Sequence, residues 1–385
     1  MINGLLRSRS NVPSGAGAGD SFGGLGAMLA GVLAIALLLT AFAGDVVGAA
    51  GGDDVLSLNL EKVIELALEN DAGYLLSRNE VRVSEIQLEQ AEAGNLIQPN
   101  PILLFQAQVG LELAQRGVDL KRHELLLEVE KDYYNILRLQ NLLQVMDEAI
   151  RLAERQVEVA QQRFDSGEAT LLDVIQARNA LAGHKADRAQ LEDNLALAQN
   201  KLLYALGLPR GTQFVLDATV VTEELPNISL EEALAEGLAN RVELVQAQAG
   251  VDIAEKELAL AMNDYTPPLT RRAAEAKVAG AHLQLRQARE GISLDIQNAY
   301  NEMLNAYRRL EVTELALEEA LETHRVVQAL FDVGMATDVE ILQAQTGLAK
   351  ANSDRVHAIY DFNIARATFF RAIGWGTEAR TARGE

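Results

Sequence analysis

Two stretches decide the fold of this chain: RFDSGEATLLDVIQAR at residues 163–178 and LFDVGMATDVEILQAQ at residues 330–345. Aligned without a gap, they share seven of sixteen residues, which indicates an internal duplication with an offset of 167 residues. In each copy a Gly follows a long helical pattern, and a Thr precedes the next one. These residues are Gly167 and Thr170, then Gly334 and Thr337. Because Gly ends helices with a positive φ and Thr caps helix starts, each stretch predicts a helical hairpin.

Long helical patterns flank both turns. Before the first turn, apolar residues recur with the alternating spacing of four and three that is typical of coiled coils. They are Met146, Ile150, Ala153, Val157, Ala160 and Phe164. Proline-containing breaks at 95–104 and 262–271 interrupt the helices upstream. We therefore expect an all-α protein of long antiparallel coiled-coil helical hairpins. In the second copy, one helix should run from about Arg271 to Phe331, roughly 60 residues or 90 Å.

The duplication also predicts the domain organisation. We expect a first hairpin repeat, a linker, a second repeat and a tail, at 57–210, 211–227, 228–377 and 378–385. The linker sequence QFVLDATVVTEEL favours a short strand.

Residues 1–50 differ in composition from the rest. Arg7 and Arg9 precede an apolar run at 25–42, which is the order of a secretory signal peptide cleaved near Ala43. The run is also close to the length that spans a bilayer, so an uncleaved membrane anchor is the alternative. Either interpretation predicts an exported protein of the cell envelope.

Composition excludes several function classes. The net charge of -21 and pI near 4.7 argue against a nucleic-acid partner, which requires a basic surface. The chain has no Cys, so disulfides and thiolate sites are impossible. Its five His residues are dispersed, without metal-ligand spacing, at 123, 184, 282, 324 and 357. Without a recognisable catalytic arrangement, we expect no enzyme activity, no catalytic residue, no metal and no cofactor.

The duplicated turn resembles that of the TolC-like outer membrane efflux protein family. The resemblance rests on the pattern F-D-x-G-x-A-T followed by an acidic residue and Q-A, on the leading segment LNLEKVIELALEN, and on the Gly that closes each last helix. It implies a homotrimer whose hairpins form a hollow α-barrel in the outer membrane and periplasm. It also implies partners: a periplasmic adaptor (membrane fusion) protein and an inner-membrane efflux pump or type I secretion transporter.

The resemblance also assigns roles to the turn residues. Gly167, Thr170, Gly334 and Thr337 would form the adaptor-docking tip. Asp173, Asp338 and Glu340 would form an acidic tip or gate, although carboxylates just after a turn are also typical solvated helix caps. The second turn contains no basic residue that could begin a salt bridge to lock the tip.

The chain departs from the family between the helices of each repeat. The second copy has only about eight residues there, at 263–270, too few for a pair of membrane strands. In the first copy, ILLFQAQVGLEL at 102–113 fits a short hairpin or continuous helix. The family's membrane β-barrel strands should therefore be reduced or absent.

Two functions fit these features. The first is an envelope efflux or secretion duct, a trimeric exit channel for small molecules or proteins. The alternative is an envelope-anchored coiled-coil scaffold with no conducting activity. Asn298, Asn301, Asn305 and Arg308 recur at helical spacing, which suits a wet lumen and also ordinary solvent exposure.

Overall fold

The computed structural model describes residues 56–216 and 224–374, which belong to one unit of the chain. The signal peptide or anchor expected at residues 1–50 lies outside these ranges. The first half contains β1 (Leu56–Leu58), α2 (Leu60–Asn70), α3 (Ala72–Ile97), α4 (Pro101–Asp165), α5 (Leu171–Ala205) and β2 (Phe214–Leu216). The second half contains α6 (Leu230–Asn240), α7 (Val242–Ala261), α8 (Pro268–Asp332) and α9 (Asp338–Ala372). The predicted long helical hairpins and their duplication are confirmed.

The two halves repeat the same helix lengths. Helices α4 and α8 have 65 residues each, α5 and α9 have 35 each, and α2 and α6 have 11 each. A 65-residue helix is about 98 Å long, slightly more than the sequence predicted. Asn100 caps α4, where its side chain accepts a hydrogen bond from Leu103 N, and Pro101 occupies the first turn, which tolerates a missing N–H. Residues 102–113 are helical, which decides between the two predicted alternatives.

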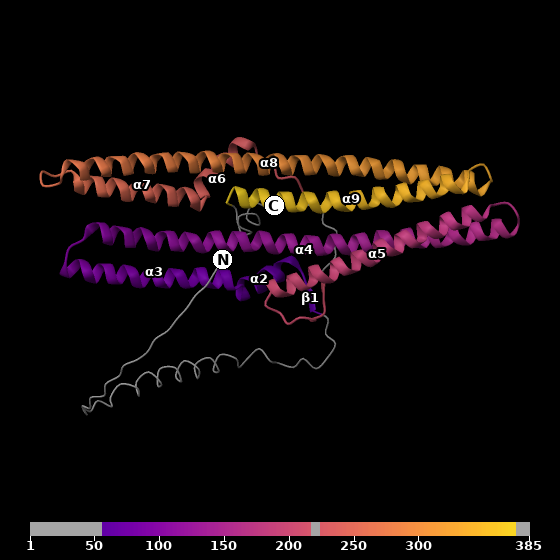
Figure 1. Ribbon diagram of the computed structural model, residues 1–385, viewed down its shortest axis with the longest axis horizontal. Coiled ribbons are helices and arrows are strands. Elements are labelled where there is room, and N and C mark those ends of the chain that lie inside the picture. Colours follow the sequence, from indigo (N-terminus) through magenta and orange to yellow (C-terminus); the bar gives the residue numbers. More distant parts are fainter. Residues whose placement is uncertain (1–55, 217–223, 375–385) are drawn as a thin grey trace, which may run out of the picture. The chain divides into compact units, whose positions relative to one another are not determined.

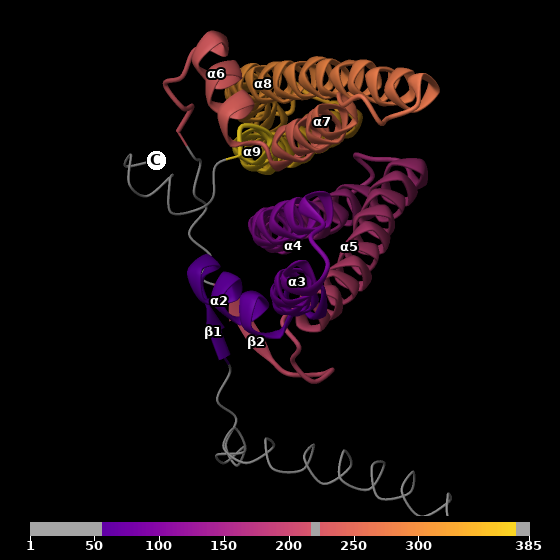
Figure 2. The ribbon, with the colours of Figure 1, turned by 90° about the vertical axis from the view of Figure 1, so that its left-hand side faces the viewer.

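Helices α5, α4, α9 and α8 lie side by side in this order over the half of the unit that carries the Gly turns (Figure 1). Over the other half the order is α3, α4, α7 and α8 (Figure 2). The layer therefore has α4 in its interior and α8 at one edge along its whole length. Among residues 56–216 and 224–374, no helix has both the length and the apolar character needed to cross a membrane.

Two large hydrophobic cores stabilise the layer. One gathers Val129, Ile136 and Leu202 of the first repeat with Tyr360 from α9. The other gathers Ile296, Phe362, Phe369 and Phe370 of the second repeat. Phe369 and Phe370 are both fully buried in this second core.

Tyr360 joins the repeats, because its hydroxyl accepts a 2.8 Å hydrogen bond from Asn141 Nδ2 of α4. Burial raises the pKa of Tyr360 to about 12. The linker strand expected from the sequence is present as β2, which pairs in parallel with β1 in the register Leu56↔Phe214, Ser57↔Val215 and Leu58↔Leu216.

The predicted apolar seam of α4 is correct only in part. Ala153 and Ala160 are buried, and Ala160 packs against Val174 and Ala177 of α5. Phe164, expected to end the seam, is 38% exposed. Helix α4 ends at Asp165, and its hairpin partner α5 begins only at Leu171. The ring of Phe164 therefore lies beside the turn and not against α5.

Candidate functional site

The two Gly turns have the same backbone geometry. Gly167 and Gly334 have φ values of 82° and 75°. In the first turn, Glu168 N donates to Arg163 O at 2.8 Å and Gly167 N donates to Phe164 O at 3.0 Å. In the second turn, the same bonds run from Met335 N to Leu330 O and from Gly334 N to Phe331 O. This pair of bonds defines a Schellman motif, which satisfies the last carbonyls of the helix.

The helix that leaves each turn begins with a reciprocal capping box. Thr170 N donates to Asp173 Oδ2 at 2.7 Å, and Asp173 N donates to Thr170 Oγ1 at 3.3 Å. Thr337 and Glu340 repeat this arrangement with the same two distances. The side-chain hydroxyl and backbone N–H of Thr170 lower the pKa of Asp173, and the backbone N–H and hydroxyl of Thr337 lower that of Glu340.

Asp338 is held differently from the other two acidic residues. Its Oδ2 lies 2.7 Å from Arg163 Nη1, and its Oδ1 accepts a 3.2 Å hydrogen bond from Gln156 Nε2. Both donors come from α4 of the first repeat. The guanidinium of Arg163 also lies 5.2 Å from the centre of the Phe331 ring. These contacts tie the two hairpins together beside their turns.

The structure therefore separates the residues that the sequence grouped. Gly167, Thr170 and Gly334 are exposed at the turns, and Thr337 is the cap of α9 in the second turn. Asp173 and Glu340 serve as local caps, whereas the Asp338 side chain is only 14% exposed and is paired with Arg163.

Sequence reasoning missed Arg163 and Gln156. The sequence nevertheless contained a signal for the ion pair between Arg163 and Asp338. Each of these charged residues aligns with a Leu in the other repeat. Arg163 aligns with Leu330, and Asp338 aligns with Leu171. The second turn does lack a basic residue, but its Asp338 forms an ion pair with Arg163 of the first repeat.

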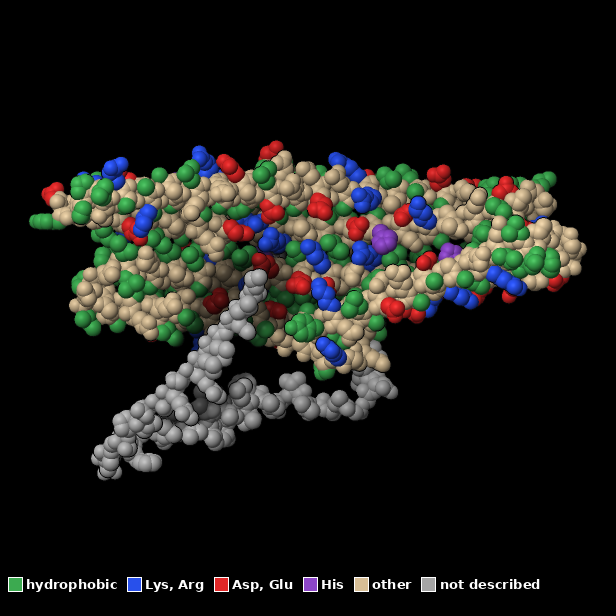
Figure 3. Space-filling model, viewed as in Figure 1, with side chains coloured by type: hydrophobic (Ala, Val, Ile, Leu, Met, Phe, Trp, Pro, Cys, Tyr) green, Lys and Arg blue, Asp and Glu red, His purple; other side chains and the backbone are tan. Residues whose placement is uncertain are grey.

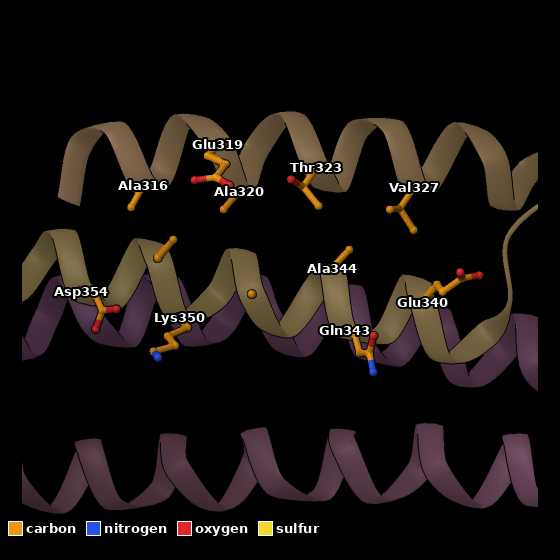
Figure 4. A pocket seen from close by; sticks show the side chains of 12 residues that line it. Ala316, Glu319, Ala320, Thr323, Val327, Glu340, Gln343, Ala344, Lys350 and Asp354 are labelled. Atoms are coloured by element: carbon orange, nitrogen blue, oxygen red, sulfur yellow. The ribbon is translucent and has the colours of Figure 1, made fainter. Parts of the chain in front are cut away.

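Grooves run along the helices near both turns. One groove of about 490 Å³ lies between α8 and α9, and its floor carries small side chains, among them Ala320 and Ala344 (Figure 4). Glu319, Lys350 and Asp354 line the same groove. A second groove of about 580 Å³ lies between the two repeats and includes Arg163 and Phe331. Grooves floored by small residues admit a helix at close range.

The side chains that could bind a metal are scattered over the part of the chain that the structure describes. Within residues 56–216 and 224–374, no group of three His, Asp or Glu side chains could hold a metal ion. All five His residues lie in these ranges and remain dispersed.

The fold and its turns define a protein built of two tandem helical hairpins with paired, capped Gly turns. The profile of the family described as "Outer membrane efflux protein" matches residues 104–208 and 269–375, more than half of the chain. The chain therefore belongs to the outer membrane efflux protein family, as its TolC-like turns predicted. This membership places it among efflux channels of the outer membrane and periplasm, and not among enzymes.

Relatives and solved structures agree with this assignment. The chain is 25% identical over 356 residues to outer membrane protein TolC of Vibrio cholerae serotype O1, covering 79% of this chain and 80% of the relative. It is 21% identical over 318 residues to cation efflux system protein CusC of Escherichia coli K12, covering 70% and 68%. The crystal structure of VceC from Vibrio cholerae aligns with a TM-score of 0.67 at 16% identity, covering 82% of this chain and 96% of VceC. A CusC structure aligns with a TM-score of 0.69 at 15% identity, covering 86% and 96%.

Proposed function

We propose that this chain is one protomer of a homotrimeric export duct that spans the periplasm. The duct works with a periplasmic adaptor protein and an inner-membrane efflux pump or type I secretion transporter, and it exports small molecules or proteins. Family membership and the relatives named for efflux support the proposal. The structural observation that carries it is the open edge of the helix layer.

A single layer of helices leaves the outer faces of its two edge helices without partners. On edge helix α8, Leu294, Val312 and Leu315 are each at least 60% exposed. Positions 294 and 312 are 18 residues apart, or about five turns, so they share one face of the helix. Leu197 on the opposite edge helix, α5, is also exposed. Rows of large apolar side chains along a helix edge mark a protein contact.

Rotational symmetry removes such edges if α8 of one protomer packs against the α5 edge of the next. Heterologous contacts of this kind form a closed ring when the rotation between neighbouring protomers closes, as it does in a symmetric trimer. A ring of these layers encloses a passage whose length is set by the 65-residue helices, about 98 Å. A scaffold dimer would cover only one edge and would leave the other exposed.

The turns at one end of this cylinder are the proposed adaptor-docking tip. Gly167 and Gly334 end the helices, while Thr170 and Thr337 fix the direction of the helices that follow. A hairpin of the adaptor would lie in the small-residue groove between α8 and α9. Asp173 and Glu340 bring negative charge to the mouth of the passage, which favours cations over anions. Asp338 would contribute by holding the two hairpins together.

The test combines assembly with conduction. Val312→Asp places a charge on the α8 edge, and Leu321→Asp is the matched control, because Leu321 is also exposed on α8 but lies nine residues away and so does not share the face of Val312. The purified full chain should have the mass of a trimer by light scattering in detergent and should conduct ions in planar bilayers. V312D should lose both properties, and L321D should keep both. A trimer that never conducts would favour the scaffold, and a monomer or dimer unaffected by V312D would refute the edge contact.

A further inference from the structure

A polar groove lies beside the middle of α8, away from the Gly turns. Its volume is about 690 Å³, and side chains of α4, α8 and α9 line it. Charged and amide side chains in its lining include Lys131 of α4, Glu302, Asn305 and Arg309 of α8, and Asp361 of α9. We call it the polar groove.

The polar groove opens on the face of the layer that is turned away from α6. Ile296 of α8 is fully buried and lies close to Gly237 of α6. Asn305 follows Ile296 by nine residues, or about 2.5 helical turns, so the two side chains point in opposite directions. Figure 2 shows α6 on one side of the layer. Figure 3 views the other side and shows acidic and basic side chains gathered near its middle.

Helix α8 places opposite charges at two levels of the polar groove. Glu302 and Arg309 are seven residues apart, so they share one face of the helix and lie about 10 Å apart along its axis. Asn305 lies between them, and all three side chains are exposed. Over residues 56–216 and 224–374, no ion pair or side-chain hydrogen bond holds Glu302 or Arg309. The fold therefore leaves both charges available to a ligand.

The level of Arg309 is the more positive of the two. The rings of Tyr307 and Phe362 are 5.4 Å apart, which brings Arg309 of α8 level with Asp361 of α9. Arg138 Nη1 of α4 lies 3.5 Å from Asp361 Oδ1 at the same level. Two guanidinium groups therefore accompany one carboxylate there.

The level of Glu302 is balanced. Lys131 precedes Arg138 by seven residues on α4, which runs in the same direction as α8 (Figure 1). It therefore lies about 10 Å from the Arg138 level, toward Glu302. One ammonium and one carboxylate line this part of the polar groove, so a ligand's cationic group is accepted here and its anionic group near Arg309.

An extended tripeptide with free termini matches this spacing. Each extended residue adds about 3.3–3.6 Å, so the terminal ammonium and carboxylate are about 10 Å apart. Hydrogen bonds between oppositely charged groups are the strong ones, and Glu302 and Arg309 offer one at each end. The Asn305 amide is both donor and acceptor, as a peptide group is. Apolar lining for the central side chain comes from Ala306, Ile364 and Ala365.

We propose that the polar groove binds short zwitterionic peptides in an extended conformation, with the peptide carboxylate at Arg309 and the peptide ammonium at Glu302. A simple anion gains only the contact at Arg309, and a simple cation gains only the contact at Glu302. The site uses neither the Gly turns nor the exposed edge of α8. Its failure would therefore leave the proposed duct untouched.

Peptide binding to the full chain in detergent tests the proposal. The probe is alanyl-leucyl-alanine with free termini, and equilibrium dialysis measures its dissociation constant. The same peptide with an acetylated N-terminus and an amidated C-terminus should bind about tenfold more weakly or less, because it carries neither charge. Equal binding of the two peptides would overturn the proposal, and so would a failure of the free peptide to bind.

A pair of variants tests the two residues. E302Q/R309Q should bind the free peptide about tenfold more weakly than the unaltered chain, whereas E318Q/R325Q should bind it equally well. Glu318 and Arg325 repeat the same charges at the same spacing on α8 and are exposed, but they do not line the polar groove. Circular dichroism checks that both variants fold alike. Unchanged binding by E302Q/R309Q, or the same loss in both variants, would contradict the assignment of the site.

Discussion

The ion pair between Arg163 and Asp338 should fix the two hairpins together beside their turns. The two atoms Arg163 Nη1 and Asp338 Oδ2 are 2.7 Å apart, and the side chains are 30% and 14% exposed. Exposed pairs contribute about 0.2–1 kcal/mol, whereas hydrogen bonds to charged groups in partly buried sites contribute about 1.5–3 kcal/mol. We therefore expect a coupling free energy of about 1.5 kcal/mol, or roughly a tenfold change in the equilibrium for local opening.

A double-mutant cycle with R163A and D338A measures this coupling. The assay is hydrogen exchange of peptides that cover 156–178 and 330–345, and for the control pair of peptides that cover 147 and 188, because it reports local opening rather than global unfolding. Asp338 also lies in the first turn of α9, so D338A alone should cost about 2 kcal/mol once the lost helix-dipole contribution is included. The cycle removes the helix-dipole contribution, because D338A loses it both in the presence and in the absence of Arg163.

The matched control is the pair Arg188–Asp147, which joins α5 to α4 at 2.6 Å with side chains 36% and 53% exposed. Its coupling should stay below about 1 kcal/mol, because solvent screens it. A coupling for Arg163 and Asp338 that is no larger than the control value would refute the claim that burial strengthens the pair.

Three further predictions concern stability. Gly167→Ala should cost about 1–2 kcal/mol in thermal unfolding, because only its positive φ opposes a side chain. Gly207→Ala should cost more at a similar φ, since its Cβ would lie 2.8 Å from Asn70 Cβ, and equal costs would contradict the steric argument. The pKa values of Asp173 and Glu340 are lowered from 3.8 and 4.5, so their stabilisation is present at neutral pH and is lost as pH falls through the lowered pKa values. The hydrogen-exchange protection factors of both turns should therefore fall below about pH 4, and D173N/E340Q should remove this acid-dependent step. Burial raises the pKa of Asp132 despite a hydrogen bond from Lys201, so the charged form is disfavoured in the fold, and D132N should leave the urea midpoint at pH 7 unchanged or higher.

The turns were predictable because their chemistry is local. Gly at the helix end and Thr three residues later specify a Schellman motif and a capping box through atoms within six residues of one another. The same holds for the proline breaks, which end α3 at Ile97 and begin α8 at Pro268. Duplication strengthened the prediction, since two copies gave the same answer.

The failures of prediction involve partners that are distant in sequence. Phe164 fits the heptad of α4 but is 38% exposed, because it lies at the end of α4 beside the turn. The short helices α2 and α6 pass directly into α3 and α7, at Asp71 and Arg241, by different means. Asp71 caps the start of α3, where its side chain accepts a hydrogen bond from Tyr74 N. Arg241 instead binds Asp295 of α8 at 2.8 Å and the carbonyl of Ala372 at 3.0 Å. Nothing in the local pattern around Arg241 indicates those partners.

The sequence by itself determined the duplication, the long helices and the capped Gly turns, because each depends on periodicity or on neighbours along the chain. Only the tertiary structure decided which helices lie side by side, with α4 against α9, and therefore which charges meet. Arg163 and Asp338 are 175 residues apart, and Asn141 and Tyr360 are 219 apart. Helical periodicity shows which face of a helix is buried but not which helix covers it, so these pairs depend on packing between the repeats.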